Sequence, residues 1–278
     1  MIPKKLHYCW FGKGPIPQSQ LDCIKTWSEV MPDYEIKRWD ETNFDVNQFE
    51  FTRQAYEKKL YSFVTDIVRF YAIYTEGGIY LDTDIEMVKS FDPFLHHPWF
   101  SGIQVYYDDF IPLGLPLLGL DRLPVVRNKE TEGVFTGSLG FNAAVIGSEV
   151  GNPFVKECMD WFTSRPFINQ DGVLYNKVIN PAIMPYIAEK LGFRYFNDYQ
   201  ILSDGGVIYP ANVFVCDEVD TCARTVAIHH SAQSWQPKTK EELKQLELDK
   251  KGLLKPYLFI KKWQKKFNHL IKRVIGRE

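Results

Sequence analysis

Two aspartates, Asp82 and Asp84, stand one residue apart at the end of the short apolar run GGIYL, residues 77–81. Carboxylates this close raise each other's pKa unless a cation lies between them. A hard divalent cation, Mn²⁺ or Mg²⁺, takes oxygen ligands and leaves positions open for phosphate oxygens. Such a cation neutralises the charge that develops when a diphosphate departs. The pair therefore predicts a metal-dependent leaving-group site, with two unrelated surface acids as the alternative.

The surrounding sequence predicts the elements that would position this pair. Residues 79–81 are expected to form a buried strand, and residues i and i+2 of a strand share one face. Further strands are predicted at 5–11, 34–39 and 141–146, and helices at 18–30, within 48–76 and at 153–162. This alternation is typical of an α/β fold with a mostly parallel, Rossmann-like sheet flanked by helices. Ligands bind beyond the carboxyl ends of such strands, where Asp82 and Asp84 are expected.

One further pair of polar residues and one long loop could act with the acid pair. Asp66 and Arg69 lie three residues apart on the predicted second helix of 48–76, so they share a face. A simple surface ion pair is the alternative. Residues 106–137 contain many Pro and Gly residues and are expected to form a long loop over the site.

The stretch SFVTDIVRFYAIYTEGGIYLDTD, residues 62–84, resembles the DXD-containing sugar-binding region of glycosyltransferase family 32. That family includes enzymes of capsular polysaccharide synthesis and relatives of the yeast outer-chain mannosyltransferase. The stretch is also similar to the catalytic domain of the glucosylating bacterial toxins. IPKKLHYCWFG at 2–12 and AIHHSAQSW at 227–235 match the same pattern in the same order. The resemblance implies a GT-A type fold and metal-dependent transfer of a sugar from a nucleotide donor, with retention of configuration.

The resemblance also implies roles for individual residues. Asp84 would bind the metal, and Asp82 the ribose or a metal-bound water. The other implied catalytic or donor-binding residues are Asp66 and Arg69 at the sugar hydroxyls, Trp10 stacked on the base, Tyr80 near the ribose, Asn142 near the sugar, and Ser234 and Trp235 at the diphosphate. For Trp10 and Tyr80 the alternative is core packing, and for Asn142 a turn at a strand end.

The later motif offers a third metal ligand. A histidine is a good ligand for manganese beside two carboxylates. His229 and His230 are both candidates. His229 is favoured because the single histidine of the family pattern fits best after Ala227 and Ile228.

The C-terminal segment has its own composition. Residues 250–278 contain ten Lys or Arg against one acid, although the net charge of the chain is −2. Apolar residues recur there at three- and four-residue steps: Ile260, Trp263, Phe267, Leu270, Ile271 and Val274. This pattern predicts a basic amphipathic helix at an anionic membrane surface. A helix packed on the body of the protein is the alternative, and the apolar stripe disfavours nucleic acid as a partner.

Composition sets broad limits on the class of protein. A chain of 278 residues with 45% hydrophobic and 24% charged residues can form a sizeable core. Five scattered cysteines without a CxxC pair argue against a zinc site and for a reducing compartment. We therefore expect a cytoplasmic protein, peripheral at the inner face of the membrane. A catalytic domain is predicted at 1–248, with its donor-binding part at 1–95 and its acceptor side at 96–248, followed by the helix at 249–278.

These observations predict a glycosyltransferase that moves a hexose from a nucleotide sugar to a glycan, with a polyprenyl-linked acceptor in surface polysaccharide synthesis. Analogy favours a UDP-sugar over GDP-mannose, because Trp10 stacking suits a uracil better. Two other classes compete with this prediction. A non-catalytic sugar-binding protein would bind without turnover. A DxD phosphatase would use the first Asp as nucleophile, but its pair follows the first strand of the chain.

Overall fold

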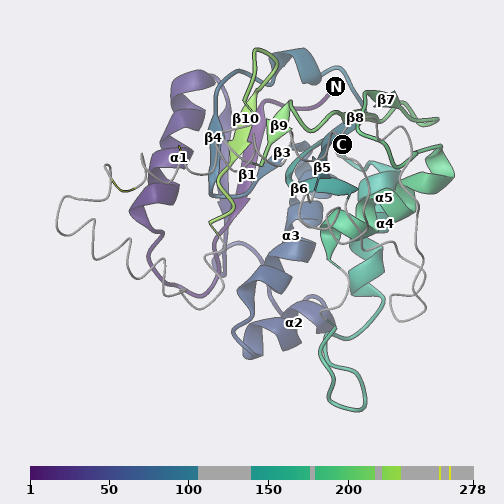
Figure 1. The fold of residues 1–278 in the computed structure, drawn as a ribbon. Coiled ribbons are helices and arrows are strands. Elements are labelled where there is room, and N and C mark those ends of the chain that lie inside the picture. Colours follow the sequence, from purple (N-terminus) through teal and green to yellow (C-terminus); the bar gives the residue numbers. More distant parts are fainter. Residues whose placement is uncertain (106–138, 176–178, 217–220, 233–256, 258–262, 264–278) are drawn as a thin grey trace.

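A computed structural model describes residues 1–105, 139–175, 179–216 and 221–232, together with 257 and 263 (Figure 1). The helices are α1 (Gln18–Val30), α2 (Glu50–Glu57), α3 (Tyr61–Glu76), α4 (Pro153–Thr163) and α5 (Asn180–Ala188). The strands are β1 (Lys5–Cys9), β2 (Glu35–Trp39), β3 (Gly78–Leu81), β4 (Ile85–Met87), β5 (Trp99–Val105), β6 (Leu139–Ser148), β7 (Gln200–Ile201), β8 (Val207–Tyr209), β9 (Phe214–Val215) and β10 (Ala227–His229). The loop predicted at 106–137 and the helix predicted at 249–278 lie outside the described residues, apart from 257 and 263.

The described strands form two sheets. The larger has seven strands in the order β2-β1-β3-β6-β5-β8-β7, and the smaller has the order β4-β10-β9. In the larger sheet β1 is parallel to β2 and β3, and β5 is parallel to β8, whereas β6 is antiparallel to both β3 and β5. The predicted α/β fold, a central sheet flanked by helices, is confirmed. In the parallel half of this sheet, formed by β2, β1 and β3, the motif at 2–12 ends beyond β1 and the motif at 62–84 ends beyond β3.

Side chains alternate across β3 and divide the core into two parts. Tyr80 points into a core shared with α2 to α5, while Ile79 and Leu81 point into a second core shared with α1 and the small sheet. Figure 1 shows α1 and α3 on different sides of the strands. α1 is held to the small sheet through Trp27, whose indole N–H donates to the carbonyl of Ile85 at 2.7 Å.

Two adjacent glycines connect α3 to β3. Gly77 ends the helix with φ 65° and ψ −174°, a conformation that is open mainly to glycine, and its N–H donates to the carbonyl of Ile73. Gly78 has φ 104°, and a Cβ placed there would lie 2.5 Å from the carbonyl oxygen of Lys5. The first glycine turns the chain, and the second lets β3 approach β1 closely enough to pair.

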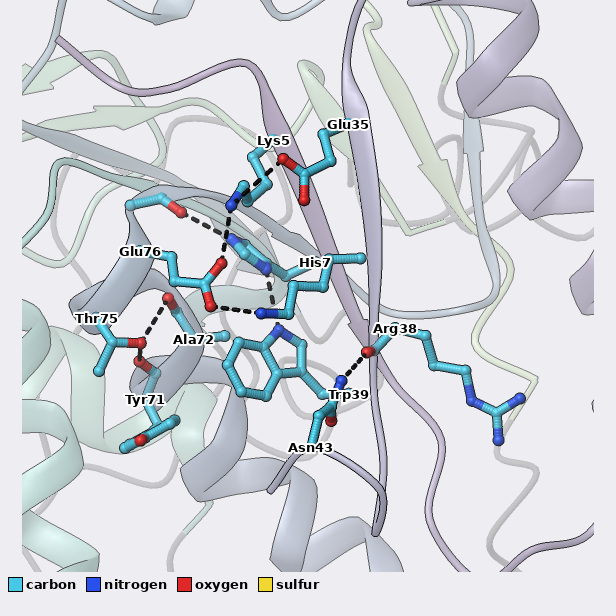
Figure 2. Close-up of polar contacts among 12 residues, drawn as sticks. Lys5, His7, Glu35, Arg38, Trp39, Asn43, Tyr71, Ala72, Thr75 and Glu76 are labelled. Atoms are coloured by element: carbon cyan, nitrogen blue, oxygen red, sulfur yellow. Dashed lines mark hydrogen bonds and ion pairs between the residues drawn. The ribbon is translucent and has the colours of Figure 1, made fainter. Parts of the chain in front are cut away.

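A buried histidine lies under this junction (Figure 2). His7 is fully buried, its Nε2 is 2.7 Å from the carbonyl oxygen of Gly77, and the Trp39 indole N–H donates to its Nδ1 at 3.0 Å. Because a carbonyl can only accept, Nε2 must carry the proton and Nδ1 must be bare. A protonated ring would set a second N–H against the indole N–H. The neutral form of His7 is therefore built into the fold.

We expect this histidine to make the protein less stable in mild acid. Burial lowers the pKa of His7 from 6.5 to about 4. Between these two pH values the imidazole is protonated in the unfolded chain and neutral in the folded chain. The stabilisation is complete above pH 6.5 and is lost as the pH falls toward 4, a change of about 3 kcal/mol. Urea unfolding of the wild type and His7→Gln at pH 7 and pH 4.5 measures it. The stability gap between the two should narrow at pH 4.5, and a constant gap would contradict the assignment.

Candidate active site

The acid pair lies in a tight turn rather than on a strand. β3 ends at Leu81, and the Ile85 N–H donates to the carbonyl of Asp82 at 3.1 Å, which closes a turn before β4. The expectation that the two acids share a face of one strand was therefore wrong. The turn nevertheless brings their carboxylates together. Thr83 points away from them and donates its hydroxyl to Gln20 on α1 at 2.9 Å.

A histidine from a distant part of the chain completes the cluster. β10 pairs antiparallel with β4 so that His229 lies opposite Ile85. One ligand atom each from Asp82, Asp84 and His229 lies within 4.8 Å of the others. The Nε2 atom of His229 is 3.4 Å from Oδ1 of Asp84, and both side chains are largely buried.

The donor atoms of this cluster suit a divalent cation. Two ligands bound at a right angle to Mg²⁺, with bonds of about 2.1 Å, lie about 3 Å apart, close to the separation of His229 Nε2 and Asp84 Oδ1. Burial lowers the pKa of His229, but Asp84, with smaller effects of Cys216 and Asp82, raises it to about 10, so the carboxylates favour a positive charge beside them. Nδ1 of His229 is buried without a hydrogen-bond partner. Two carboxylates and an imidazole are therefore placed to hold Mn²⁺ or Mg²⁺.

The backbone after β10 fixes Asp84 further. Asp84 accepts a hydrogen bond from the Ala232 N–H at 2.7 Å, and its carbonyl accepts one from the His230 N–H at 3.1 Å. Burial raises the pKa of Asp84, but the contact with His229 and the hydrogen bond from the Ala232 N–H outweigh it, so the pKa is lowered and the acid stays charged. The side chain of His230 turns the other way, with Nε2 2.9 Å from Oε2 of Glu86. The structure thus brings His229 to the acid pair and directs His230 elsewhere.

The two histidines should differ in their effect on metal binding. His229→Asn is expected to weaken Mn²⁺ binding at least about tenfold, since it removes the imidazole nitrogen beside Asp84. His230→Asn is expected to change the affinity less than about twofold. Isothermal titration of Mn²⁺ into the two variants measures this difference. Equal losses in both variants would contradict the choice of His229.

Arg69 joins the acid pair to a third carboxylate. Its side chain is only 7% exposed, and Nη2 lies 3.1 Å from Oδ1 of Asp66 while Nη1 lies 3.5 Å from Oδ1 of Asp82. Nη1 also donates to the carbonyl of Ala143 at 2.6 Å. Asp66 and Arg69 do form the ion pair considered as an alternative from the sequence, but it is buried and reaches the site.

A β-bulge in the neighbouring strands makes room for this contact. The pairing of β5 with β6 shifts register between Ser101 and Ile103. Ala143 faces that irregularity, so its carbonyl is available to Arg69. The Ala144 carbonyl accepts the Asp82 N–H at 3.0 Å. The bulge thus anchors both the guanidinium and the start of the acidic turn.

Two further predicted residues hold this region together. The Tyr80 hydroxyl donates to Oδ1 of Asp82 at 2.6 Å from an almost fully buried ring. Asn142 is fully buried on β6, and its side-chain amide N–H donates to the carbonyl of Phe214 at 3.1 Å. Its side-chain oxygen, Oδ1, accepts the Ala144 N–H at 3.1 Å. Asn142 thus lies within a strand rather than at a strand end, and it links β6 to β9.

Three predicted residues remain, and the structure describes only one of them, Trp10. Trp10 directly follows β1, and its indole N–H donates to the carbonyl of Gly14 at 2.7 Å. Because β1 is parallel to β3, with His7 opposite Tyr80, Trp10 and Asp82 leave the same edge of the sheet. Ser234 and Trp235 lie outside the described residues.

Asn180 belongs to the site but was not predicted from the sequence. It is fully buried at the start of α5, and its amide donates to both the backbone carbonyl and Oδ1 of Asp66, at 3.1 and 2.9 Å. These two acceptors fix the orientation of the amide and leave its oxygen without a partner. No motif around this residue signals the role, because it depends on α5 packing beside α3.

Removing the Asn180 amide should make Asp66 a weaker acid. Burial raises the pKa of Asp66 to about 6, against the lowering effects of Arg69 and of the Asn180 hydrogen bond. Asn180→Ala is expected to raise that pKa by about a further unit, since a donor to the charged form is lost. A ¹³C NMR titration of the Asp66 carboxyl measures the change. Asn43→Ala, which removes an exposed amide with two hydrogen bonds of its own, should leave it unchanged.

Comparison with known proteins identifies one region of this chain. Residues 17–101 match the family model described as "Glycosyltransferase sugar-binding region containing DXD motif". This region contains Asp66, Arg69, Tyr80 and both acids of the turn. Residues 17–101 therefore carry the DXD-containing sugar-binding region of glycosyltransferases.

Individual relatives and a solved structure are similar to longer or shorter parts of the chain. Inositol phosphoceramide mannosyltransferase 3 of Schizosaccharomyces pombe is 33% identical over 137 residues, which are 46% of this chain and 37% of that protein. The matched stretch thus spans little more than a third of that relative. Uncharacterized glycosyltransferase L373 of Acanthamoeba polyphaga mimivirus is 24% identical over 249 residues, 86% of each chain. Among solved structures, PaToxG glycosyltransferase has a TM-score of 0.45 at 18% identity and 68% coverage of each chain.

Proposed function

We propose that this protein is a metal-dependent, retaining glycosyltransferase of GT-A type that moves a hexose from a nucleotide sugar to a glycan acceptor. The observation that carries the proposal is the convergence of Asp82, Asp84 and His229, with ligand atoms within 4.8 Å of one another, inside and beside the DXD region. The catalytic domain would occupy residues 1–248.

The main residues of the candidate site would have the following parts in this function. Asp84 and His229 would hold the cation, and the contacts of Asp82 with Tyr80 and Arg69 would orient its carboxylate toward that cation. The bound cation would supply positive charge to the departing nucleoside diphosphate. Arg69 and Asp66 would contact the donor sugar, and Trp10 the base. The largely buried position of Arg69 and Asp66 limits the access of water to that region.

The donor and acceptor are proposed from the Trp10 resemblance, from a relative and from the composition of residues 250–278. The resemblance of Trp10 to a stacking ring favours a UDP-sugar, whereas the name of the fission-yeast relative points to mannose as the transferred sugar. A lipid-linked glycan in surface polysaccharide synthesis is proposed from the basic pattern of 250–278, which also motivates a peripheral place on an anionic membrane. No helix among the described residues is long and apolar enough to cross a bilayer.

A donor panel tests the proposal directly. The full chain is incubated with Mn²⁺ and, separately, with UDP-glucose, UDP-galactose, UDP-N-acetylglucosamine and GDP-mannose, and release of free nucleoside diphosphate is followed. Hydrolysis of one donor, lost on adding a chelator, is expected. Metal-dependent donor binding without turnover would favour the non-catalytic sugar-binding alternative. Turnover of p-nitrophenyl phosphate with no nucleotide-sugar hydrolysis would favour the DxD phosphatase.

A further inference from the structure

The register of the small sheet places a cysteine beside the candidate metal-binding imidazole. β9 is parallel to β10, with Val215 opposite Ile228, so the next residue of each strand, Cys216 and His229, are neighbours. We propose that Cys216 is a positioning residue, whose sulfur accepts a hydrogen bond from the Nδ1 N–H of His229 and so directs Nε2 at the cation. This inference rests on the proposed metal-dependent function.

A metal-bound imidazole has a second nitrogen that needs a partner. When Nε2 of a neutral His229 gives its lone pair to a cation, the ring proton must lie on Nδ1. Nδ1 is buried, and within the described part of the chain no nitrogen or oxygen forms a hydrogen bond with it. A buried donor without an acceptor is costly, and histidines that bind metals almost always donate their other N–H to a nearby group. The site therefore requires an acceptor beside Nδ1.

Two observations place the sulfur of Cys216 in this position. After Asp84, the residue with the largest effect that raises the pKa of His229 is Cys216, through a side-chain hydrogen bond. Asn142, which is fully buried, directs an amide N–H at the same sulfur, with Nδ2 4.0 Å from Sγ. A thiol sulfur is a weak acceptor, and both the amide and the imidazole N–H are donors.

Asn142 also connects this cysteine to the acid pair. Its amide donates to the carbonyl of Phe214 at 3.1 Å and so holds β9 two residues before Cys216. Its Oδ1 accepts the Ala144 N–H, and the carbonyl of Ala144 accepts the N–H of Asp82. A fully bonded buried network of this kind is rigid. One buried amide therefore fixes the backbone that carries the thiol and the backbone that carries Asp82.

The thiol also separates the imidazole from a cavity. Cys216 lines a cavity of about 420 Å³ against the end of β5 and the segments that follow β8 and β9, and His229 is not among the described residues that line it. Removing the sulfur would let a water from the cavity reach Nδ1 and accept in its place. A substitution that keeps the volume of the side chain is therefore a stricter test than Cys216→Ala.

Cys216→Val and Cys216→Thr form a matched pair for this test. The two new side chains have the same shape, but only threonine keeps an atom that can accept from Nδ1. In titration calorimetry with Mn²⁺, Cys216→Val is expected to weaken binding by about 10–100-fold, the usual cost of losing the outer partner of a metal ligand. Cys216→Thr should stay within about threefold of the wild type, because its hydroxyl replaces the sulfur as acceptor. Equal affinities of the two variants would overturn the proposal.

Cys222→Val is the control for loss of a thiol. Cys222 lines the same cavity but is exposed, and its sulfur contacts the carbonyl of Asn212 and the N–H of Arg224. Its replacement should leave the affinity for Mn²⁺ unchanged. A loss as large as that of Cys216→Val would assign the effect to the cavity as a whole and overturn the role of Cys216.

Spectra of the metal-loaded protein check the role without a change at position 216. In ¹⁵N NMR of the Mg²⁺-loaded wild type, the ring proton of His229 should lie on Nδ1 and be protected from exchange with water. A proton on Nε2 would overturn the proposal. In Co²⁺-loaded Cys222→Val, a sulfur-to-metal charge-transfer band would show that Cys216 is itself a ligand, which would also overturn it. The expected affinities and spectra in a protein that hydrolyses no nucleotide sugar would keep the positioning role and reject the transferase.

Discussion

Replacement of Asp84 by asparagine is expected to weaken Mn²⁺ binding by more than about 100-fold and to abolish metal-dependent hydrolysis of the donor. Loss of a residue that only orients a metal ligand costs about 10–100-fold, so loss of a direct ligand should cost more. Asparagine keeps the shape of the side chain and an oxygen that can accept the Ala232 N–H. The fold should therefore survive while the negative charge beside His229 is lost.

Glu86→Gln is the matched control for this variant. Glu86 is an acid two residues further on, it contacts His230, and it lies outside the cluster of three ligands. Titration calorimetry with Mn²⁺ and the donor-hydrolysis assay should find Glu86→Gln close to wild type. Similar losses in both variants would mean that general negative charge, and not a defined site, attracts the cation. Full activity of Asp84→Asn would refute the metal-dependent mechanism.

Local pattern was sufficient to predict the parts of the site that are close in sequence. The apolar run before Asp82 predicted β3, and its two glycines marked the end of α3. The three-residue spacing of Asp66 and Arg69 predicted a shared helical face, and the structure pairs them. The predicted bounds of α1, 18–30, match the structure because its apolar residues repeat at helical spacing and a proline precedes it.

Contacts between segments that are distant in sequence could not be predicted from local pattern. β4, β9 and β10 are two or three residues long, too short for a periodic signal, yet their pairing places His229 and not His230 beside Asp84. The turn at residues 82–85 could not be distinguished from a continuing strand. Asn180 meets Asp66 only because α5 packs against the same part of the sheet. Such residues become visible once the register of the strands is known.

Arg69→Met is expected to lower the free energy of unfolding by about 3–5 kcal/mol, the usual cost of removing one member of a buried ion pair. Methionine fills much of the same volume but leaves the carboxylates of Asp66 and Asp82 facing each other without a cation. It also leaves the carbonyl of Ala143, which accepts at 2.6 Å, without its donor. Urea unfolding at pH 7 measures the loss.

Arg53→Met and Arg69→Lys locate the origin of that effect. Arg53 lies on α2 with a 40% exposed side chain that pairs with Glu57, so its replacement should change stability by no more than about 0.5 kcal/mol. Lysine at position 69 keeps the charge but lacks the planar fork that reaches Asp66, Asp82 and Ala143 together, and an intermediate loss is expected. If Arg69→Met were as stable as Arg53→Met, the guanidinium would not be what holds the three carboxyl and carbonyl groups at the site.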